Sequence, residues 1–203
     1  MVMSYIVTGS RILQPFVALI FGFALGFSLT VPPGPMNALI ASQSAMRGTR
    51  AGIITGTGAM TADIILAVTV FLARSLIDLH SIIRAIYLVG AAVLLVLVYL
   101  TLRSRKSGPA EEMRLTAYFR AVLLGVSNPF QILWWLTAGL AFAYLGGIVL
   151  LAGLFAAVAV WIVMFPALLH WGTGKHTGAA RAVSMVSAAI MLFFAAYFIY
   201  LSM

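Results

Sequence analysis

Three prolines around one glycine, Pro32-Pro33-Gly34-Pro35, interrupt the long uncharged segment 12–46. Proline lacks a backbone donor and clashes with the preceding helical turn, so no helix can continue through this segment with every backbone group paired. Hydrocarbon cannot pair those groups either. A break at membrane depth is tolerated only where it is buried in protein or lines a water-filled cavity. The segment therefore predicts a protein-lined cavity inside a membrane.

Long runs of residues without charge make up most of the chain, which is 64% hydrophobic and 8% charged. Charges are absent or nearly absent from residues 12–46, 51–73, 85–102, 121–170 and 182–203. A membrane-spanning helix needs about 20 residues, so the fourth segment should hold two helices, divided near 144–147. We therefore predict an all-α integral membrane protein, with six transmembrane helices in one domain that occupies residues 1–203.

Basic residues distribute unevenly between the two sides of these six spans. One side receives Arg47, Arg50, Arg103, Arg105, Lys106, Arg114, Arg120, Lys175 and Arg181, and the other receives only Arg11, Arg74 and Arg84. The positive-inside rule then places the basic side in the cytoplasm and both termini outside, and it explains the net charge of +8 without a nucleic-acid partner. Segment 12–46 is longer than one span needs, so it either tilts or re-enters, and re-entry would change this topology.

The hydrophilic connection 103–120 divides the chain into two halves, residues 12–102 and 121–203. Three spans in each half mean that the second half enters the membrane in the opposite direction, so the halves are expected to be inverted repeats with broken first helices. The second half carries the matching break at Ser127-Asn128-Pro129. Alone, this break could be a simple proline kink, but the pair favours a solute site of the kind that secondary transporters build.

Asp63 is the one acidic residue inside a predicted span. An aspartate at mid-membrane costs about 2.5 kcal/mol or more, so it should face the protein interior with a partner or water. Gly52, Gly56 and Ala59 share its helical face and would let another helix approach closely. Asp63 could be a structural residue bonded to a neighbour, but its position favours a site for a proton or a substrate amine.

Both breaks can start a new helix at membrane depth. Pro35 suits a first helical position, and Asn128 with Pro129 resembles an N-cap followed by a first residue. Free amides at two helix N-termini would bind a carboxylate, and Asp63 would bind an ammonium group. Together they suit a zwitterion such as an amino acid.

Polar and aromatic residues beyond each break complete the candidate site. Trp134, Trp135 and Trp161 could wall the cavity or serve as interfacial anchors. The candidate substrate-binding or coupling residues are Pro33, Gly34, Pro35, Asn37, Asp63, Asn128, Pro129, Gln131 and Trp134. The chain has no cysteine, which excludes thiol chemistry, and no motif for a metal or another cofactor is evident.

At these positions the sequence resembles the LysE/RhtB family of amino-acid exporters. The resemblance rests on Pro33-Gly34-Pro35-Met36-Asn37, on Arg47-Gly48-x-Arg50-Ala51-Gly52 with Gly58 before Asp63, and on Gly125-Val126-Ser127-Asn128-Pro129. It covers essentially the whole chain. It implies an inner-membrane secondary carrier that exports amino acids or related small metabolites, uses protons as the driving ion and forms a homodimer. Met36, which separates Pro35 from Asn37, and the bulky Trp134-Trp135 pair depart from the family pattern, so no particular substrate carries over.

Three other functions fit these features less well than proton-coupled export by alternating access. A divalent-metal or other small-ion exporter of the same superfamily is the nearest, but a hard cation prefers several oxygen ligands and the spans hold one aspartate. A membrane enzyme would need a nucleophile with a base, or a metal cluster, and neither is evident. A purely structural protein would leave the paired breaks and Asp63 unexplained.

Overall fold

The computed structural model describes residues 2–73, 79–103, 110–173 and 177–203. Nearly all of these residues are helical, which confirms the predicted all-α class. The elements are α1 (Val2–Thr30), α2 (Pro35–Arg47), α3 (Thr49–Ala73), α4 (Leu79–Arg103), α5 (Ala110–Ser127), α6 (Pro129–Trp134), the π-helical segment η1 (Trp135–Gly139), α7 (Leu140–Thr173) and α8 (Thr177–Leu201).

Four helices in the described ranges, α3, α4, α7 and α8, are long and apolar enough to cross a membrane. Helices α1 and α2 form a bent pair, at 75° to each other, which makes a fifth span when it is counted as one. The predicted span that begins at residue 121 is not a single helix, because α5, α6 and η1 divide it. The predicted boundary near 144–147 is present as a kink at Gly147, where φ is 58° and ψ is −152°.

Proline determines where both broken helices restart. Pro35 is the first residue of α2 after the extended residue Gly34, and Pro129 is the first residue of α6 after the N-cap Asn128. Proline suits this position because its missing N–H would have no helical partner there. Both predicted helix starts are confirmed. The predicted linker 103–120 is shorter than expected, since α5 is already helical from Ala110, and its residues 104–109 lie outside the described ranges.

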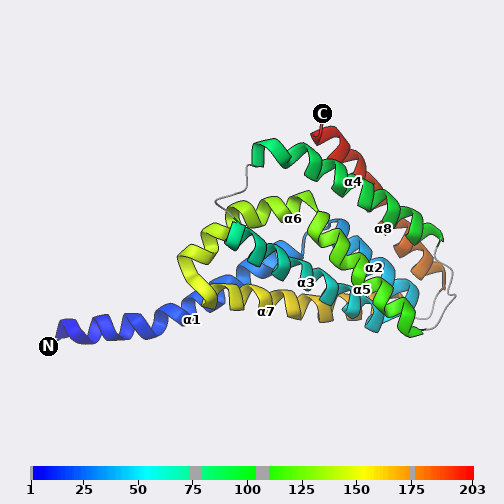
Figure 1. Cartoon of the computed structure of the whole chain (residues 1–203). Coiled ribbons are helices and arrows are strands. Elements are labelled where there is room, and N and C mark those ends of the chain that lie inside the picture. The colour runs from blue at the N-terminus through cyan, green and yellow to red at the C-terminus, as the bar shows by residue number, and fades with distance from the viewer. Residues whose placement is uncertain (1, 74–78, 104–109, 174–176) are drawn as a thin grey trace.

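Two pairs of helices pack at very short distance through glycine. A Cβ atom on Gly22 of α1 would lie 2.0 Å from the carbonyl oxygen of Leu150 of α7, and one on Gly58 of α3 would lie 2.4 Å from that of Tyr118 of α5. Small residues let helix backbones approach in lipid, where burial gives no hydrophobic drive. The pairs α1 with α7 and α3 with α5 thus surround the breaks, while α4 and α8 pack together beside them (Figure 1).

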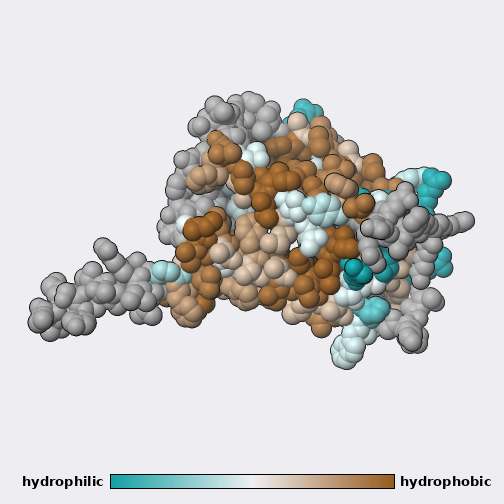
Figure 2. All heavy atoms as spheres, turned by 60° about the horizontal axis from the view of Figure 1, so that its bottom comes forward, coloured by the Kyte–Doolittle hydropathy of each residue, from teal (hydrophilic) through white to brown (hydrophobic). Residues whose placement is uncertain are grey.

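One end of the bundle is hydrophilic. Helices α2 and α4 finish there and α3, α5 and α8 begin there, at the right in Figure 1. Teal side chains gather at the same end in Figure 2, whereas the body of the protein is mostly brown. We call this the basic end, because α2 and α4 finish at Arg47 and Arg103 and because Arg50 and Arg181 lie near the starts of α3 and α8. Large apolar side chains elsewhere point outward, including Leu72 at 75% exposure, as expected of a lipid-facing surface.

Candidate functional site

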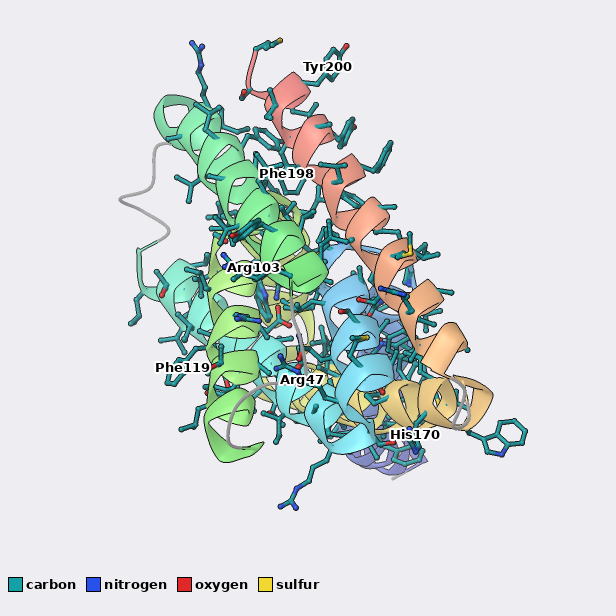
Figure 3. All side chains as sticks on the ribbon, turned by 90° about the vertical axis from the view of Figure 1, so that its right-hand side faces the viewer. Arg47, Arg103, Phe119, His170, Phe198 and Tyr200 are labelled. Atoms are coloured by element: carbon teal, nitrogen blue, oxygen red, sulfur yellow. The ribbon has the colours of Figure 1, made fainter. Side chains whose placement is uncertain are left out.

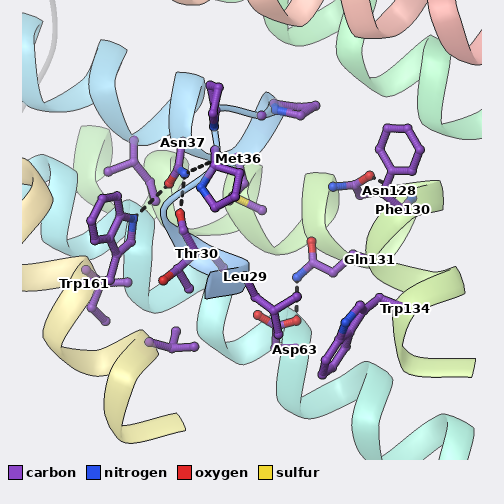
Figure 4. A pocket seen from close by; sticks show the side chains of 18 of the residues that line it. Leu29, Thr30, Met36, Asn37, Asp63, Asn128, Phe130, Gln131, Trp134 and Trp161 are labelled. Atoms are coloured by element: carbon purple, nitrogen blue, oxygen red, sulfur yellow. Dashed lines mark hydrogen bonds between the residues drawn. The ribbon is translucent and has the colours of Figure 1, made fainter. Parts of the chain in front are cut away.

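A cavity of about 320 Å³ lies where the two broken helices meet α3 and α7. Figure 4 shows its polar side chains pointing toward one another from these elements. Its lining residues come from both halves of the chain: Leu29, Thr30, Pro32, Pro33, Gly34, Pro35, Met36, Asn37, Ile40, Ala59, Asp63, Asn128, Phe130, Gln131, Trp134, Trp135, Leu154, Val158, Trp161, Ile162 and Phe194. The cavity predicted from the Pro32–Pro35 break is therefore present.

Asp63 accepts two hydrogen bonds from residues that follow the second break. Its Oδ1 atom lies 2.7 Å from Gln131 Nε2 and 2.9 Å from Trp135 Nε1. Both donors are neutral, so they stabilise a carboxylate without cancelling its charge. The side chain thus has hydrogen-bonding support inside the membrane, and it lines the cavity.

The small-residue stripe of α3 explains why Asp63 faces inward. A Cβ atom on Gly56 would lie 2.6 Å from Ile162 Cβ, and one on Gly52 would lie 2.7 Å from Pro166 Cβ, so α7 packs directly on this face. Ala59, on the same face, lines the cavity. The close approach of α7 holds Asp63 toward the interior, as the sequence predicted.

Asn37 holds the backbone of the first break in place through hydrogen bonds. Its Nδ2 atom donates to the carbonyl oxygens of Thr30 at 2.6 Å and Pro32 at 2.9 Å, and its Oδ1 atom accepts from Trp161 Nε1 at 3.1 Å. The carbonyl of Thr30 belongs to the last turn of α1 and would otherwise lack a helical partner. Asn37 lines the cavity, but its amide is largely engaged in holding the broken backbone (Figure 4).

The two helix starts differ in how they are capped. Asn128 Oδ1 accepts from the backbone N–H of Phe130 at 3.2 Å, so α6 is capped by its own side chain. Gly34, at the equivalent position before α2, makes no side-chain cap. A Cβ atom there would meet nothing within 4 Å. The start of α2 therefore presents uncapped backbone to the cavity.

Aromatic side chains form the apolar walls. The rings of Trp134 and Trp135 meet edge to face, with centroids 5.0 Å apart and planes at 87°. Gly139 makes room for both, because a Cβ atom there would lie 2.7 Å from Trp135 and 3.0 Å from Trp134. Trp135 and Gly139 are the two ends of η1, which directly follows Trp134, and π-helical turns often occur at functional sites. On the opposite wall Trp161 stacks on Phe165, with ring centroids 5.0 Å apart.

Eight of the nine candidate residues line the cavity, and Pro129 does not. Pro129 is fully buried and packs against Gly90 of α4, where a Cβ atom would lie 2.6 Å from its Cδ. The sequence reasoning missed two partnerships, those of Trp135 with Asp63 and of Trp161 with Asn37. The first had a signal, because Trp135 follows Gln131 by four residues and so shares its helical face.

Comparison with known proteins gives a family for the chain. Residues 27–202 match the family described as LysE type translocator. The match begins just before the first break and extends to the end of α8. No curated protein and no solved structure gave a match. Because the family match covers most of the chain and includes both breaks and Asp63, this protein belongs to the LysE type translocator family, whose members are transporters and not enzymes.

Proposed function

We propose that this protein is a secondary transporter that exports amino acids or closely related small metabolites across the cytoplasmic membrane in exchange for protons. The observation that carries the proposal is the shared cavity, which holds a carboxylate on one side and an uncapped helix start on the other. A volume of about 320 Å³ is at the small end of ligand pockets and suits a small solute.

The two ends of an amino acid would bind different parts of this cavity. Backbone amides and the positive end of the α2 dipole favour its carboxylate near Gly34. Asp63 Oδ1, already supported by Gln131 and Trp135, favours its ammonium group. Trp134 and Trp161 would exclude water around the solute's apolar part. This arrangement would select against a solute that lacks either charge.

Competition at Asp63 would couple export to protons. A proton and an ammonium group cannot both occupy one carboxylate, so binding of one releases the other. If protons reach Asp63 from outside and the solute reaches it from the cytoplasm, each cycle exchanges one for the other. Alternating access of the cavity to the two sides would provide that order.

We also propose six spans in two inverted repeats, α1 to α4 and α5 to α8, with α1–α2 and α5–α6 as the broken first spans. The main packing partners support this. In the proposed repeats α1 corresponds to α5 and α3 corresponds to α7, so the contact of α1 with α7 should have a counterpart between α5 and α3. Both contacts are present. In Figure 1 the broken pairs approach the middle of the bundle from opposite ends. Placing the basic end in the cytoplasm leaves both termini outside.

Reconstitution into proteoliposomes tests the proposal. Vesicles loaded in turn with each of the labelled common L-amino acids would be given a proton gradient, and solute release would be followed over time. We expect at least one amino acid to leave faster with the gradient than without it, and faster than from protein-free vesicles. Release that stays at the protein-free rate for the whole panel would contradict the proposal.

A further inference from the structure

A polar side chain without a partner lies in the packed region between the cavity and the basic end. Gln43 of α2 is only 3% exposed. In the part of the chain that the structure describes, its Oε1 is the one buried side-chain oxygen or nitrogen that has no hydrogen-bond partner. An unpaired buried acceptor costs about 1–3 kcal/mol, and such groups in folded proteins call for an explanation. Gln43 lies about one turn beyond Ile40, which lines the cavity.

The polar neighbours of Gln43 on α2 are paired, so this helix does not lack acceptors and donors in general. Ser42 Oγ lies 3.4 Å from Ser184 Oγ of α8, and Ser44 Oγ donates to the carbonyl oxygen of Pro166 at 3.0 Å. These two contacts are made with α8 and α7. Gln43 lies between Ser42 and Ser44 in the sequence, so its side chain leaves the helix in a different direction from either serine. The unpaired oxygen therefore belongs to a separate face of α2.

That face of α2 leads to a pair of arginines. Arg47 follows Gln43 by four residues, so it lies on the same face about 6 Å further along the helix. Arg47 and Arg120 of α5 are both partly buried. Arg120 lies one turn toward the basic end from Leu124, which packs in one core with Leu39 of α2. In Figure 3, which views the bundle from the basic end, Arg47 lies between the ribbons of α2 and α5. Two mutually repelling guanidinium groups are stabilised by an anion, and they favour a carboxylate in particular.

We propose that Gln43, Arg47 and Arg120 form a second binding site, at which the solute is first captured from the basic side before it reaches the cavity. The carboxylate would bind the two arginines and the amine would donate to Gln43 Oε1. Gln43 and Arg47 are about 6 Å apart along the backbone of α2, and side chains on a helix lean toward its N-terminus, so the Arg47 guanidinium can approach the same ligand as Gln43. This inference rests on the proposed export function, because it assigns a ligand of the same class.

The site is closed in this structure. Leu39, one turn before Gln43 on the same face, packs into one apolar core with Ala121 and Leu124 of α5 and Leu94 of α4. This core lies on the cavity side of Gln43, so in this structure it separates Gln43 from the cavity. The site would open when α2 and α5 separate at the basic end, and the amide oxygen would then gain its missing donor from the solute.

Thiol labelling tests this site without knowledge of the solute. The chain has no cysteine, so a Gln43→Cys variant carries one thiol. Methanethiosulfonates bearing either a sulfonate or a trimethylammonium group would be applied from the basic side of oriented vesicles. Each rate would be divided by that of the same reagent with a free thiol. We expect the sulfonate reagent to be favoured about tenfold, because positive charge concentrates anions. Arg47→Gln and Arg120→Gln in the same background should reduce that preference.

A matched control and a second position keep the test decisive. Ser42→Cys faces α8 rather than the arginines and should show no such preference. If Gln43→Cys does not fold, as judged by size-exclusion chromatography, Met46→Cys serves instead, since Met46 is partly buried near the same face. Equal normalised rates for the two reagents, or no labelling while the unmodified protein exports amino acids, would overturn the second site and leave the proposed function standing. Absence of export with a retained anion preference would instead count against the proposed function.

Discussion

Trp161 of α7 donates its indole N–H to Asn37 of α2 at 3.1 Å, and this contact has a counterpart across the cavity. Asn37 follows the first proline of α2 by two residues, and Gln131 follows the first proline of α6 by two residues. Gln131 in turn donates to Asp63 of α3 at 2.7 Å. Under the proposed repeat, α2 and α6 are therefore each hydrogen-bonded at the same position to a long helix of the other half. Of these two contacts, only that of Gln131 with Asp63 includes an ionisable group, so only that contact can respond to a proton.

Replacing Asn37 by aspartate should destabilise the first break. The substitution keeps the shape of the side chain but removes both donors to the carbonyl oxygens of Thr30 and Pro32. Each unpaired group costs about 1–3 kcal/mol, and each kcal/mol lowers the melting midpoint of a protein of this size by about 2–4 °C. Thermal unfolding in detergent measures this. Thr57→Ala, which removes an exposed hydroxyl bonded within its own helix, should leave the midpoint within about 1 °C, as surface changes usually do. Equal melting midpoints for the two variants would show that the hydrogen bonds of Asn37 do not stabilise the first break.

Gly34→Ala should weaken transport more than it weakens folding. Gly34 is extended, at φ −162° and ψ 177°, which any residue can adopt, and a Cβ atom there would meet nothing within 4 Å. The added methyl group would instead project beside the uncapped start of α2. We expect an unfolding free energy within about 1 kcal/mol of the original, and a half-saturating solute concentration raised about tenfold. A lowered melting midpoint with unchanged half-saturation would show that the glycine serves the fold and not the solute.

Gly139→Ala should disturb Asp63 through the two tryptophans. The new methyl group would lie 2.7 Å from Trp135 and 3.0 Å from Trp134, so the indoles must shift, at a cost of about 1–3 kcal/mol. Because Trp135 donates to Asp63, we expect a lower export rate together with a change in tryptophan fluorescence. The matched control is Gly172→Ala, where a Cβ atom would meet nothing within 4 Å. An export rate equal to that of the control would contradict this coupling.

The helical class and the starts of α2 and α6 were predictable because they depend on local chemistry. Long uncharged runs require helices in a membrane, and a proline after an extended residue fixes a helix start whatever surrounds it. The gathering of Asp63, Gln131 and Asn128 at one cavity also followed, since Asp63 and both breaks were expected at membrane depth and Gln131 lies two residues beyond the second break. These features need no knowledge of how the helices pack.

Features that depend on packing between distant helices could not be read from the sequence. Trp161 is 124 residues from Asn37, and its hydrogen bond requires α7 to pass directly beside α2. The sequence predicted the position of the kink at Gly147, but it does not show how far α7 extends on either side of that residue. The division of the span from residue 121 into α5, α6 and η1 depends on the cavity that these segments enclose.

Asp63→Asn provides the most direct test of the central claim, that one carboxylate binds protons and solute in turn. Asparagine keeps the size of the side chain and an oxygen that can accept from Gln131 and Trp135, but it cannot bind or release a proton. The measurement is solute release from proteoliposomes with and without a proton gradient, with Thr57→Asn on the exposed face of the same helix as the control. We predict that the gradient no longer accelerates release by Asp63→Asn, while the control responds as the unmodified protein does. Acceleration of Asp63→Asn to the unmodified rate would contradict the account.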